Sequence, residues 1–264
     1  MTGRLQDKVV VVTGAASRSE GVGTGKAMAI LAAREGAKLV LVNRSAERGQ
    51  TLKAEIEAEG GVAMSFAADV TQASDMQAMA EAAEARFGRI DVLCNNVGGS
   101  AGRSGSVSAL AEADWHATLA LNLTSAMLAS KACLPAMQRA GGGSILNISS
   151  VVGVLGLMSH TGAAAYAAAK AGLLGLTLSL AADYAKDGIR ANCIVVGTVY
   201  TPMVESQGTE ARARRAAMVP LRREGLGWDV GWGMVYLASD EARWITGAML
   251  PIDGGLLNVR DWPR

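Results

Sequence analysis

Short apolar runs alternate along this chain with longer amphipathic segments. A run such as KVVVV (8–12), in which β-branched residues follow one another, is typical of a strand that is covered on both faces in a parallel sheet. A segment such as 46–59, with apolar residues every three to four positions, predicts a helix. On this basis we predict strands at 8–12, 38–42, 62–68, 90–93, 144–148, 189–195 and 248–252, and helices at 26–37, 46–59, 73–87, 112–138, 162–186 and 228–239.

The regular alternation of strand and helix predicts an α/β fold with one doubly wound domain that covers 1–264. We expect Pro135 to interrupt the helix at 112–138 late in its course. Between the sixth strand and the last helix, the segment 203–223 combines mixed charge with methionines. Its expected position at the carboxyl edge of the sheet indicates a substrate lid around 200–223, with a surface helix as the alternative.

Composition narrows the class of protein. The 264 residues are 50% hydrophobic, and the formal net charge is +1 with acidic and basic residues interspersed, which does not suggest a nucleic-acid footprint. The apolar run at 171–182 is shorter than the about 20 residues that span a bilayer, and the N-terminus lacks an apolar signal region. Cys94, Cys133 and Cys193 show no metal-ligand spacing. We therefore expect a cytoplasmic protein with reduced, buried thiols and with no membrane, nucleic-acid or metal partner.

A glycine-rich turn joins the first strand to the first helix. Glycines let the backbone approach a pyrophosphate, and the first turn of a helix offers unpaired N–H groups and the positive end of its dipole. Turns also favour glycine, but the position between strand and helix strengthens the interpretation. The candidate phosphate-binding residues are Gly14, Ser17, Gly23, Thr24 and Gly25.

Asn43 and Arg44 follow the second strand, where folds of this kind choose between cofactors. A carboxylate here would accept hydrogen bonds from the adenosine ribose, whereas an arginine accommodates a 2′-phosphate. Arg18, in the glycine-rich turn, is a second candidate phosphate partner. We therefore favour NADP(H) over NAD(H), with a solvated surface charge as the alternative for each arginine. Asp69, after the third strand, is a candidate acceptor for an adenine amino group or a cap for the helix at 73–87.

Tyr166 and Lys170 lie four residues apart, on one face of the helix predicted at 162–186. A nearby ammonium favours the ionised form of a phenol, so a tyrosine placed in this way can exchange a proton with an alcohol. Ser150 leaves the preceding strand and could bind the same substrate oxygen. The alternative is a chance pair that points into solvent. Asn122, inside the helix at 112–138, is a poor helix former and is either a satisfied polar group or a functional one.

Taken together, these motifs resemble the short-chain dehydrogenases/reductases over almost the whole chain. The order and spacing of TGAAS, GTG, Asp69-Val70, NNVGG (95–99), Asn122, ISS, YAAAK and SDEARWITGAMLPIDGG (239–255) carry the resemblance. It implies a Rossmann-like seven-stranded parallel sheet, hydride transfer with NAD(P), and a homo-oligomer, a tetramer or a dimer. It assigns acid/base chemistry to Tyr166, substrate contact to Ser150, ribose binding and a lowered Tyr pKa to Lys170, and a bound water to Asn122. It also places Val70, Asn95, Val97, Gly98, Tyr166, Gly197, Val199 and Thr201 at the cofactor.

Four features depart from the family pattern. About five extra residues separate Gly14 from Gly23-Thr24-Gly25, although Gly21-Val22-Gly23 offers another alignment. Val97 stands where the family has alanine, and Val196-Gly197 stands where it has Pro-Gly, which we expect to loosen that turn. Ser150 lies 16 residues before Tyr166, so the loop at 151–165 is longer than usual. In that loop we expect Leu155, Leu157, Met158 and His160 to be candidates for the substrate pocket, with a surface position favoured for His160.

Three functions remain open. The first is hydride transfer between NADP(H) and a carbonyl or secondary alcohol of a small or medium, mostly apolar substrate. The second is an NAD-dependent dehydrogenase that oxidises a cyclic diol or an alcohol from aromatic degradation. The third is a non-catalytic nucleotide-binding sensor, which would have no use for a tuned phenol.

Overall fold

The computed structural model describes residues 3–17, 19–156, 162–202, 204 and 208–259. Seven parallel strands form the main sheet in the order β3-β2-β1-β4-β5-β6-β9. This confirms the predicted fold class. The strands are β1 (Val9–Thr13), β2 (Lys38–Asn43), β3 (Val62–Ala67), β4 (Val92–Asn95), β5 (Gly143–Ser150), β6 (Ile189–Val196) and β9 (Met249–Ile252).

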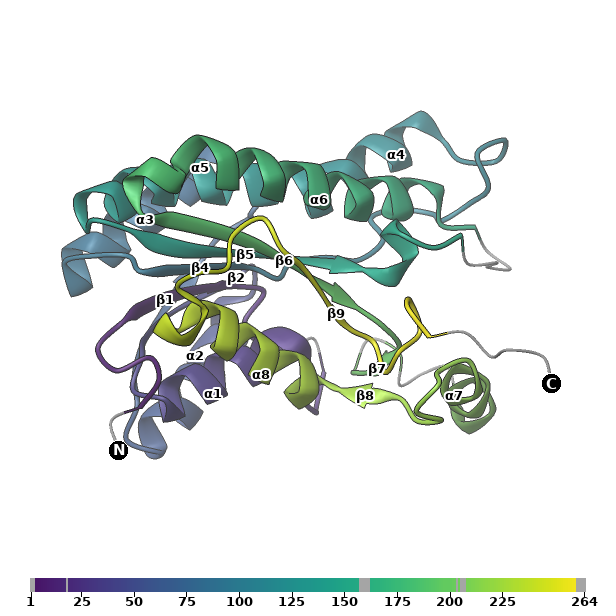
Figure 1. The fold of residues 1–264 in the computed structure, drawn as a ribbon, viewed down its shortest axis with the longest axis horizontal. Coiled ribbons are helices and arrows are strands. Elements are labelled where there is room, and N and C mark those ends of the chain that lie inside the picture. Colours follow the sequence, from purple (N-terminus) through teal and green to yellow (C-terminus); the bar gives the residue numbers. More distant parts are fainter. Residues whose placement is uncertain (1–2, 18, 157–161, 203, 205–207, 260–264) are drawn as a thin grey trace.

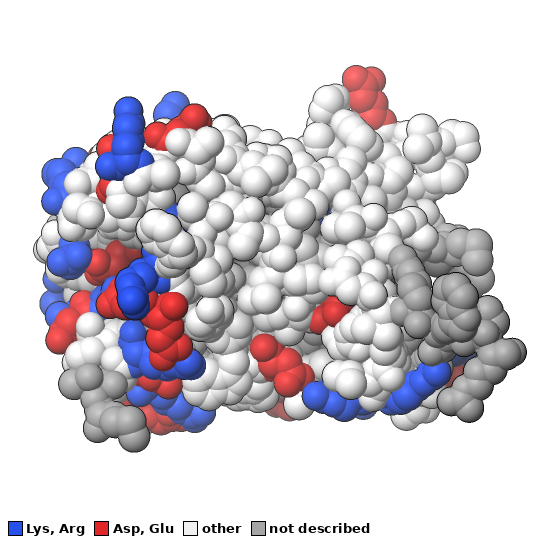
Figure 2. Space-filling model, viewed as in Figure 1, with Lys and Arg blue, Asp and Glu red and all other residues white. Residues whose placement is uncertain are grey.

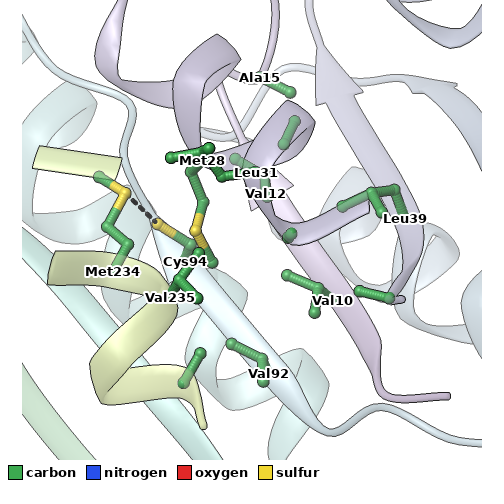
Figure 3. Close-up of a cluster of buried hydrophobic side chains, with 14 of the residues drawn as sticks. Val10, Val12, Ala15, Met28, Leu31, Leu39, Val92, Cys94, Met234 and Val235 are labelled. Atoms are coloured by element: carbon green, nitrogen blue, oxygen red, sulfur yellow. Dashed lines mark hydrogen bonds between the residues drawn. The ribbon is translucent and has the colours of Figure 1, made fainter. Parts of the chain in front are cut away.

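Helices cover both faces of this sheet (Figure 1). One layer holds α1 (Thr24–Arg34), α2 (Ala46–Ala58) and α8 (Gly227–Ala238), and the other holds α3 (Ala73–Phe87), α5 (Ser125–Arg139) and α6 (Ala164–Tyr184). The strand pleat divides the core in two, because Val10 and Val12 face the first layer while Val9 and Val11 face the second. In Figure 3, Met28 of α1 and Met234 of α8, both in the first layer, lie next to Cys94 of β4.

The helix predicted at 112–138 differs from the expectation in where it is interrupted. It runs from α4 (Glu112–Leu119) through a π-helical segment (Ala120–Thr124) into α5. Pro135 lies inside α5 and does not end it, since the helix continues to Arg139. The irregularity therefore falls around Asn122, where an extra residue is accommodated in one turn, rather than at the proline.

Strand β4 begins two residues later than predicted, because Asp91 is used as a polar anchor ahead of the strand. Its Oδ2 accepts a hydrogen bond from the backbone N–H of Val9 at 2.9 Å. The helix α4–α5 and the helix that contains α6 are long and apolar enough to cross a membrane by length and composition. Here both pack on the sheet, with α6 against β5 and β6. We interpret them as core helices.

Two short strands that the sequence pattern did not predict, β7 (Val199–Tyr200) and β8 (Gly225–Leu226), pair in parallel outside the main sheet. Between them lies α7 (Gly208–Ala217), which has no buried residue. Figure 1 shows α7 beyond the carboxyl end of the sheet, and Figure 2 shows basic side chains at this end and mixed charges gathered at the opposite end. The remaining 3-10 turns are Val151–Gly153, Ala185–Asp187 and Asp240–Ala242.

Candidate active site

A cavity of about 500 Å³ lies along the carboxyl ends of β1, β2 and β4. The sheet order reverses between β1 and β4, and such a switch point is where open α/β sheets bind ligands. Twelve of the predicted cofactor residues line the cavity: Gly14, Ser17, Gly23, Thr24, Gly25, Asn43, Arg44, Asp69, Val70, Val97, Gly98 and Thr201.

The glycine-rich turn forms one wall of this cavity. Its Ser17 Oγ accepts a hydrogen bond from the Gly23 N–H at 2.9 Å. This bond joins the two sides of the turn across the extra residues of the loop. Helix α1 begins directly after, at Thr24, and Gly23 provides no side-chain cap. This geometry is consistent with the alignment on Gly23-Thr24-Gly25. The uncapped first turn of α1 therefore presents backbone N–H groups and the positive end of its dipole toward the cavity, as an anion would require.

Asn96 holds the turn in place from β4. Its Nδ2 donates to the carbonyls of Thr13 and Gly14 at 3.2 and 3.1 Å, and its Oδ1 accepts from the Thr24 hydroxyl at 2.7 Å. At Gly25, a Cβ would lie 2.2 Å from the Gly14 carbonyl oxygen. Only glycine fits at position 25, because the backbone of the turn occupies the space that a side chain would need. The turn and the first turn of α1 together fit the pyrophosphate of a dinucleotide.

At the far end of the cavity, polar and basic groups follow β2. Asn43 Oδ1 accepts from the Ala16 N–H at 2.8 Å, while its buried Nδ2 has no partner among the described residues. Arg44 is exposed and lines the cavity together with Ser45 and Arg48. No carboxylate stands at this end of β2. The residues at this end of the cavity therefore suit an anion better than the diol of a ribose.

Asp69 closes the same end from β3. Its Oδ1 accepts from the backbone N–H and the hydroxyl of Thr71, at 2.9 and 2.7 Å, and these bonds lower the pKa of the carboxyl group. The alternative that Asp69 caps α3 is wrong, because Gln72 occupies the cap position and its side chain makes no capping bond. The contact of Asp69 with adenine stays a prediction.

Tyr166, Ser150 and Lys170 meet close to Gly98, one of the residues that line the cavity. Tyr166 is hydrogen-bonded to the Ser150 side chain, and the Lys170 ammonium lies 5.6 Å from the centre of the phenol ring. Lys170 is buried, and its Nζ donates to the Ile148 carbonyl at 2.7 Å. A Cβ on the cavity-lining Gly98 would lie 2.8 Å from this Nζ. The ammonium therefore lies directly behind the cavity wall.

The chain's similarity to known proteins matches this geometry. A sequence profile of the family described as enoyl-(acyl carrier protein) reductase matches residues 14–257. The chain is 38% identical to 2-(S)-hydroxypropyl-CoM dehydrogenase 3 of Xanthobacter autotrophicus, across 98% of this chain and 100% of the relative. It is 37% identical to 3-oxoacyl-(acyl-carrier-protein) reductase of Thermotoga maritima, across 96% and 99%. A Burkholderia xenovorans structure described as a short-chain dehydrogenase/reductase matches with a TM-score of 0.91 and 39% identity, across 98% and 100%.

The chain belongs to the short-chain dehydrogenase/reductase family. Members of this family use NAD(P)(H), and the two relatives named above are by name a dehydrogenase and a reductase. The protein is therefore an NAD(P)-dependent oxidoreductase that acts on hydroxyl or carbonyl groups, and the non-catalytic sensor is set aside.

The pKa of the tyrosine in this short-chain dehydrogenase/reductase differs from the sequence-based expectation. Burial raises the pKa of Tyr166, and the hydrogen bond from Ser150 opposes this only in part. Burial also lowers the pKa of Lys170 to about 8. Lys170 is not among the causes that lower the pKa of Tyr166, and burial sets the direction of both shifts, since desolvation disfavours the charged form of both groups.

Asn122 is buried in the π-helical segment and its side chain is fully satisfied. Its Oδ1 accepts from the Gly99 N–H at 3.0 Å, and its Nδ2 donates to the carbonyls of Gly99 and Thr118 at 2.7 and 2.8 Å. The side chain thereby fixes the loop that follows β4 beside Lys170. The predicted water relay at Asn122 stays a prediction.

Three predicted cofactor residues lie elsewhere. Asn95, the last residue of β4, points away from the cavity, and its Nδ2 donates to Asn147 Oδ1 at 2.9 Å. Asn96 takes its place at the cavity. Gly197 packs against Asp253, and its N–H donates to the Ile252 carbonyl at 3.0 Å. The expected loosening of this turn stays a prediction. Val199 belongs to the hydrophobic core.

Several further predictions fall on residues that the structure does not describe, namely those at Arg18, Leu157, Met158 and His160. Sequence reasoning also missed Ser45 and Arg48, although their place in the helix that follows Arg44 could have suggested them. The three cysteines are buried and unpaired, as predicted. Among the described residues, no group of three His, Cys, Asp or Glu could hold a metal ion.

The lowered pKa of Lys170 predicts a pH dependence of stability. Between its folded value of about 8 and its ordinary value of 10.5, the unfolded chain binds more protons than the folded one, so raising the pH stabilises the fold. We expect the wild type to gain about 1–2 kcal/mol relative to Lys170→Met between pH 7 and pH 9.5. Urea unfolding of both proteins at the two pH values measures this, and a constant difference would contradict it.

Proposed function

We propose that this enzyme transfers a hydride between NADP(H) and the carbonyl or secondary alcohol carbon of a small or medium, mostly apolar substrate. The observation that carries the proposal is the hydrogen-bonded Tyr166–Ser150 pair with the Lys170 ammonium beside it, where Lys170 adjoins Gly98 in the wall of a cavity that fits a dinucleotide. When bound, the nicotinamide cofactor supplies or accepts the hydride.

Each residue has one task in this proposal. Ser150 holds the substrate oxygen, and Tyr166 donates a proton to it or removes one. Because burial raises the pKa of Tyr166, the phenol is protonated at neutral pH, which is the form that a carbonyl needs as it becomes an alcohol. Lys170 keeps a positive charge close to the phenol, which stabilises the phenolate that remains. Carbonyl reduction is therefore favoured near neutral pH and alcohol oxidation at higher pH.

The apolar character of the substrate rests on the described part of the loop after Ser150. Val154 on that loop is 44% exposed, and Leu155 is half-buried. We also propose that the segment around 200–223 covers the substrate. Helix α7 is attached through charges, with Arg212 and Arg215 at 2.9 and 3.0 Å from Glu224. Such polar anchoring suits an element that moves during turnover.

The proposal includes association of identical chains. Leu178 of α6 and Met127 of α5 are exposed, and Figure 2 shows a broad uncharged area over α6. An apolar helix face of this kind is typical of a surface that a second copy covers.

Nicotinamide absorbance followed with a panel of ketones and secondary alcohols tests the reaction. We expect reduction of apolar ketones with NADPH. Turnover restricted to NAD+ and cyclic diols would instead support the NAD-dependent diol dehydrogenase. Cofactor binding without turnover on any of these substrates would contradict the proposed reaction.

The choice of NADP(H) has its own test at Arg44. Removing a charged hydrogen bond to phosphate costs about 1.5–3 kcal/mol, so Arg44→Ala should raise the KM for NADPH about 10- to 100-fold and leave the KM for NADH nearly unchanged. Arg139→Ala is the matched control, since Arg139 pairs with Glu84 on the surface. An equal loss for both cofactors would contradict the assignment.

A further inference from the structure

Lys170 touches strand β5 twice, at neighbouring residues. Its Nζ donates to the Ile148 carbonyl at 2.7 Å, and its own backbone carbonyl accepts from the Ser149 hydroxyl, also at 2.7 Å. Ser149 and Lys170 are both almost fully buried. The lysine is thus bound to the strand at both ends, through its ammonium and through its main chain.

The 3-10 turn at Val151–Gly153 packs closely on the same part of α6. A Cβ on Gly153 would lie 2.7 Å from both the Lys170 carbonyl carbon and the Ala171 nitrogen. The backbone of α6 at Lys170 is therefore held between Ser149 of β5 and the 3-10 turn that follows Ser150. Tyr166 lies one turn earlier on the same helix, so the distance between α6 and β5 at Lys170 also sets the place of the phenol.

We propose that Ser149 is a positioning residue for the reaction, which holds Lys170 and, through α6, Tyr166 in register with Ser150. Ser149 does not reach the substrate, since residues next to each other on a strand face opposite sides. The inference rests on the proposed roles of Tyr166 and Lys170.

The neighbours of Lys170 allow a specific readout. Among the described residues, the titratable groups that bear on it are Tyr166 on its own helix and Cys193 on β6. Ile148, Ser149 and Asn122 contribute neutral groups. Because burial is the main influence on the ammonium, loosening the contact with β5 admits water and moves the pKa of Lys170 up toward its ordinary value.

Ser144 provides a matched control on the same strand. It is buried like Ser149, and its hydroxyl donates to a helix carbonyl, that of Leu237, at 3.0 Å. Ser144→Ala and Ser149→Ala should therefore lower the melting temperature to a similar degree. If Ser149 only stabilised the fold, the two variants would also behave alike in catalysis.

The experiment measures kcat and kcat/KM against pH for Ser149→Ala, Ser149→Thr and Ser144→Ala, on a ketone that the wild type reduces. We expect Ser149→Ala to lose about 10-fold in kcat or more and to shift the alkaline limb of its pH profile upward by about 0.5. Ser149→Thr, which keeps the hydroxyl, should recover most of the rate, and Ser144→Ala should keep the wild-type profile. Equal profiles for the two alanine variants would overturn the inference.

Two further variants complete the experiment. Ser149→Cys keeps the volume with a weaker donor, and it replaces Ser149→Ala in the comparison should the alanine variant fail to fold. Tyr166→Phe distinguishes the two levels of the proposal. An active Tyr166→Phe variant overturns the proposed site and this inference with it. If Tyr166→Phe is inactive but Ser149→Ala and Ser144→Ala have equal pH profiles, the inference alone is overturned.

Discussion

Tyr166→Phe should lose about 10³-fold in kcat, since general acid–base catalysis by a positioned side chain contributes about 10²–10⁴-fold. The variant keeps the ring and loses the one group that can exchange a proton with the substrate oxygen. Cofactor binding should stay near the wild-type value, because Tyr166 does not line the dinucleotide cavity. Steady-state rates with NADPH and a reducible ketone, together with the fluorescence of bound NADPH, measure both effects.

Tyr184→Phe is the matched control for this substitution. Tyr184 ends the same helix and packs against the core of the α3–α5–α6 layer, far along α6 from Ser150. Loss of its hydroxyl should leave kcat within about 2-fold of the wild type, as is usual for substitutions away from a site. Comparable activity of the two variants would remove Tyr166 from the proton transfer.

The sheet was predictable from the sequence because its strands are buried on both faces. Val9 to Val12 read as one apolar run for that reason, and the same holds for β2 and β6. The short pair β7–β8 has no such pattern. Its two-residue strands sit outside the main sheet, and their pairing depends on where α7 places the chain.

The candidate site was predictable in its residue types and less so in its orientations. Asn95 and Asn96 are neighbours with the same chemistry, and they are separated only by the end of β4, which falls at Asn95. Asn95 therefore joins the core network, while Asn96, just after the strand, holds the glycine-rich turn. The pKa of Tyr166 shows the same limit. The four-residue spacing reveals the ammonium next to the phenol, but the burial that raises the pKa comes from strands and loops that are distant in sequence.

Gly25→Ala should weaken cofactor binding through the backbone of the turn rather than through any lost side chain. The added Cβ would lie 2.2 Å from the Gly14 carbonyl oxygen and 2.5 Å from Asn96 Nδ2, closer than these atoms can approach. Either the carbonyl or the amide must move, and the hydrogen bond of 3.1 Å between them is then lost. Overpacking of this kind costs about 1–3 kcal/mol.

That cost has two measurable consequences, because the turn is both part of the fold and the proposed phosphate cradle. We expect the dissociation constant for NADPH to rise about 5- to 100-fold, and the melting temperature to fall by about 2–10 °C. Isothermal titration with NADPH and thermal unfolding without it give the two values separately. Gly105→Ala is the control, since the nearest atoms to its added Cβ lie 3.5 Å away, at an ordinary contact distance.

The two measurements also separate the role of the turn in folding from its role in binding. A variant that is destabilised but binds NADPH as tightly as the wild type would show that the turn relaxes without cost to the ligand. It would then contradict the assignment of Gly14, Gly25 and the first turn of α1 to the pyrophosphate. Weakened binding of NADPH and NADH to the same degree would support it, because both cofactors carry that pyrophosphate and differ only at the 2′-phosphate, for which Arg44 is the proposed partner.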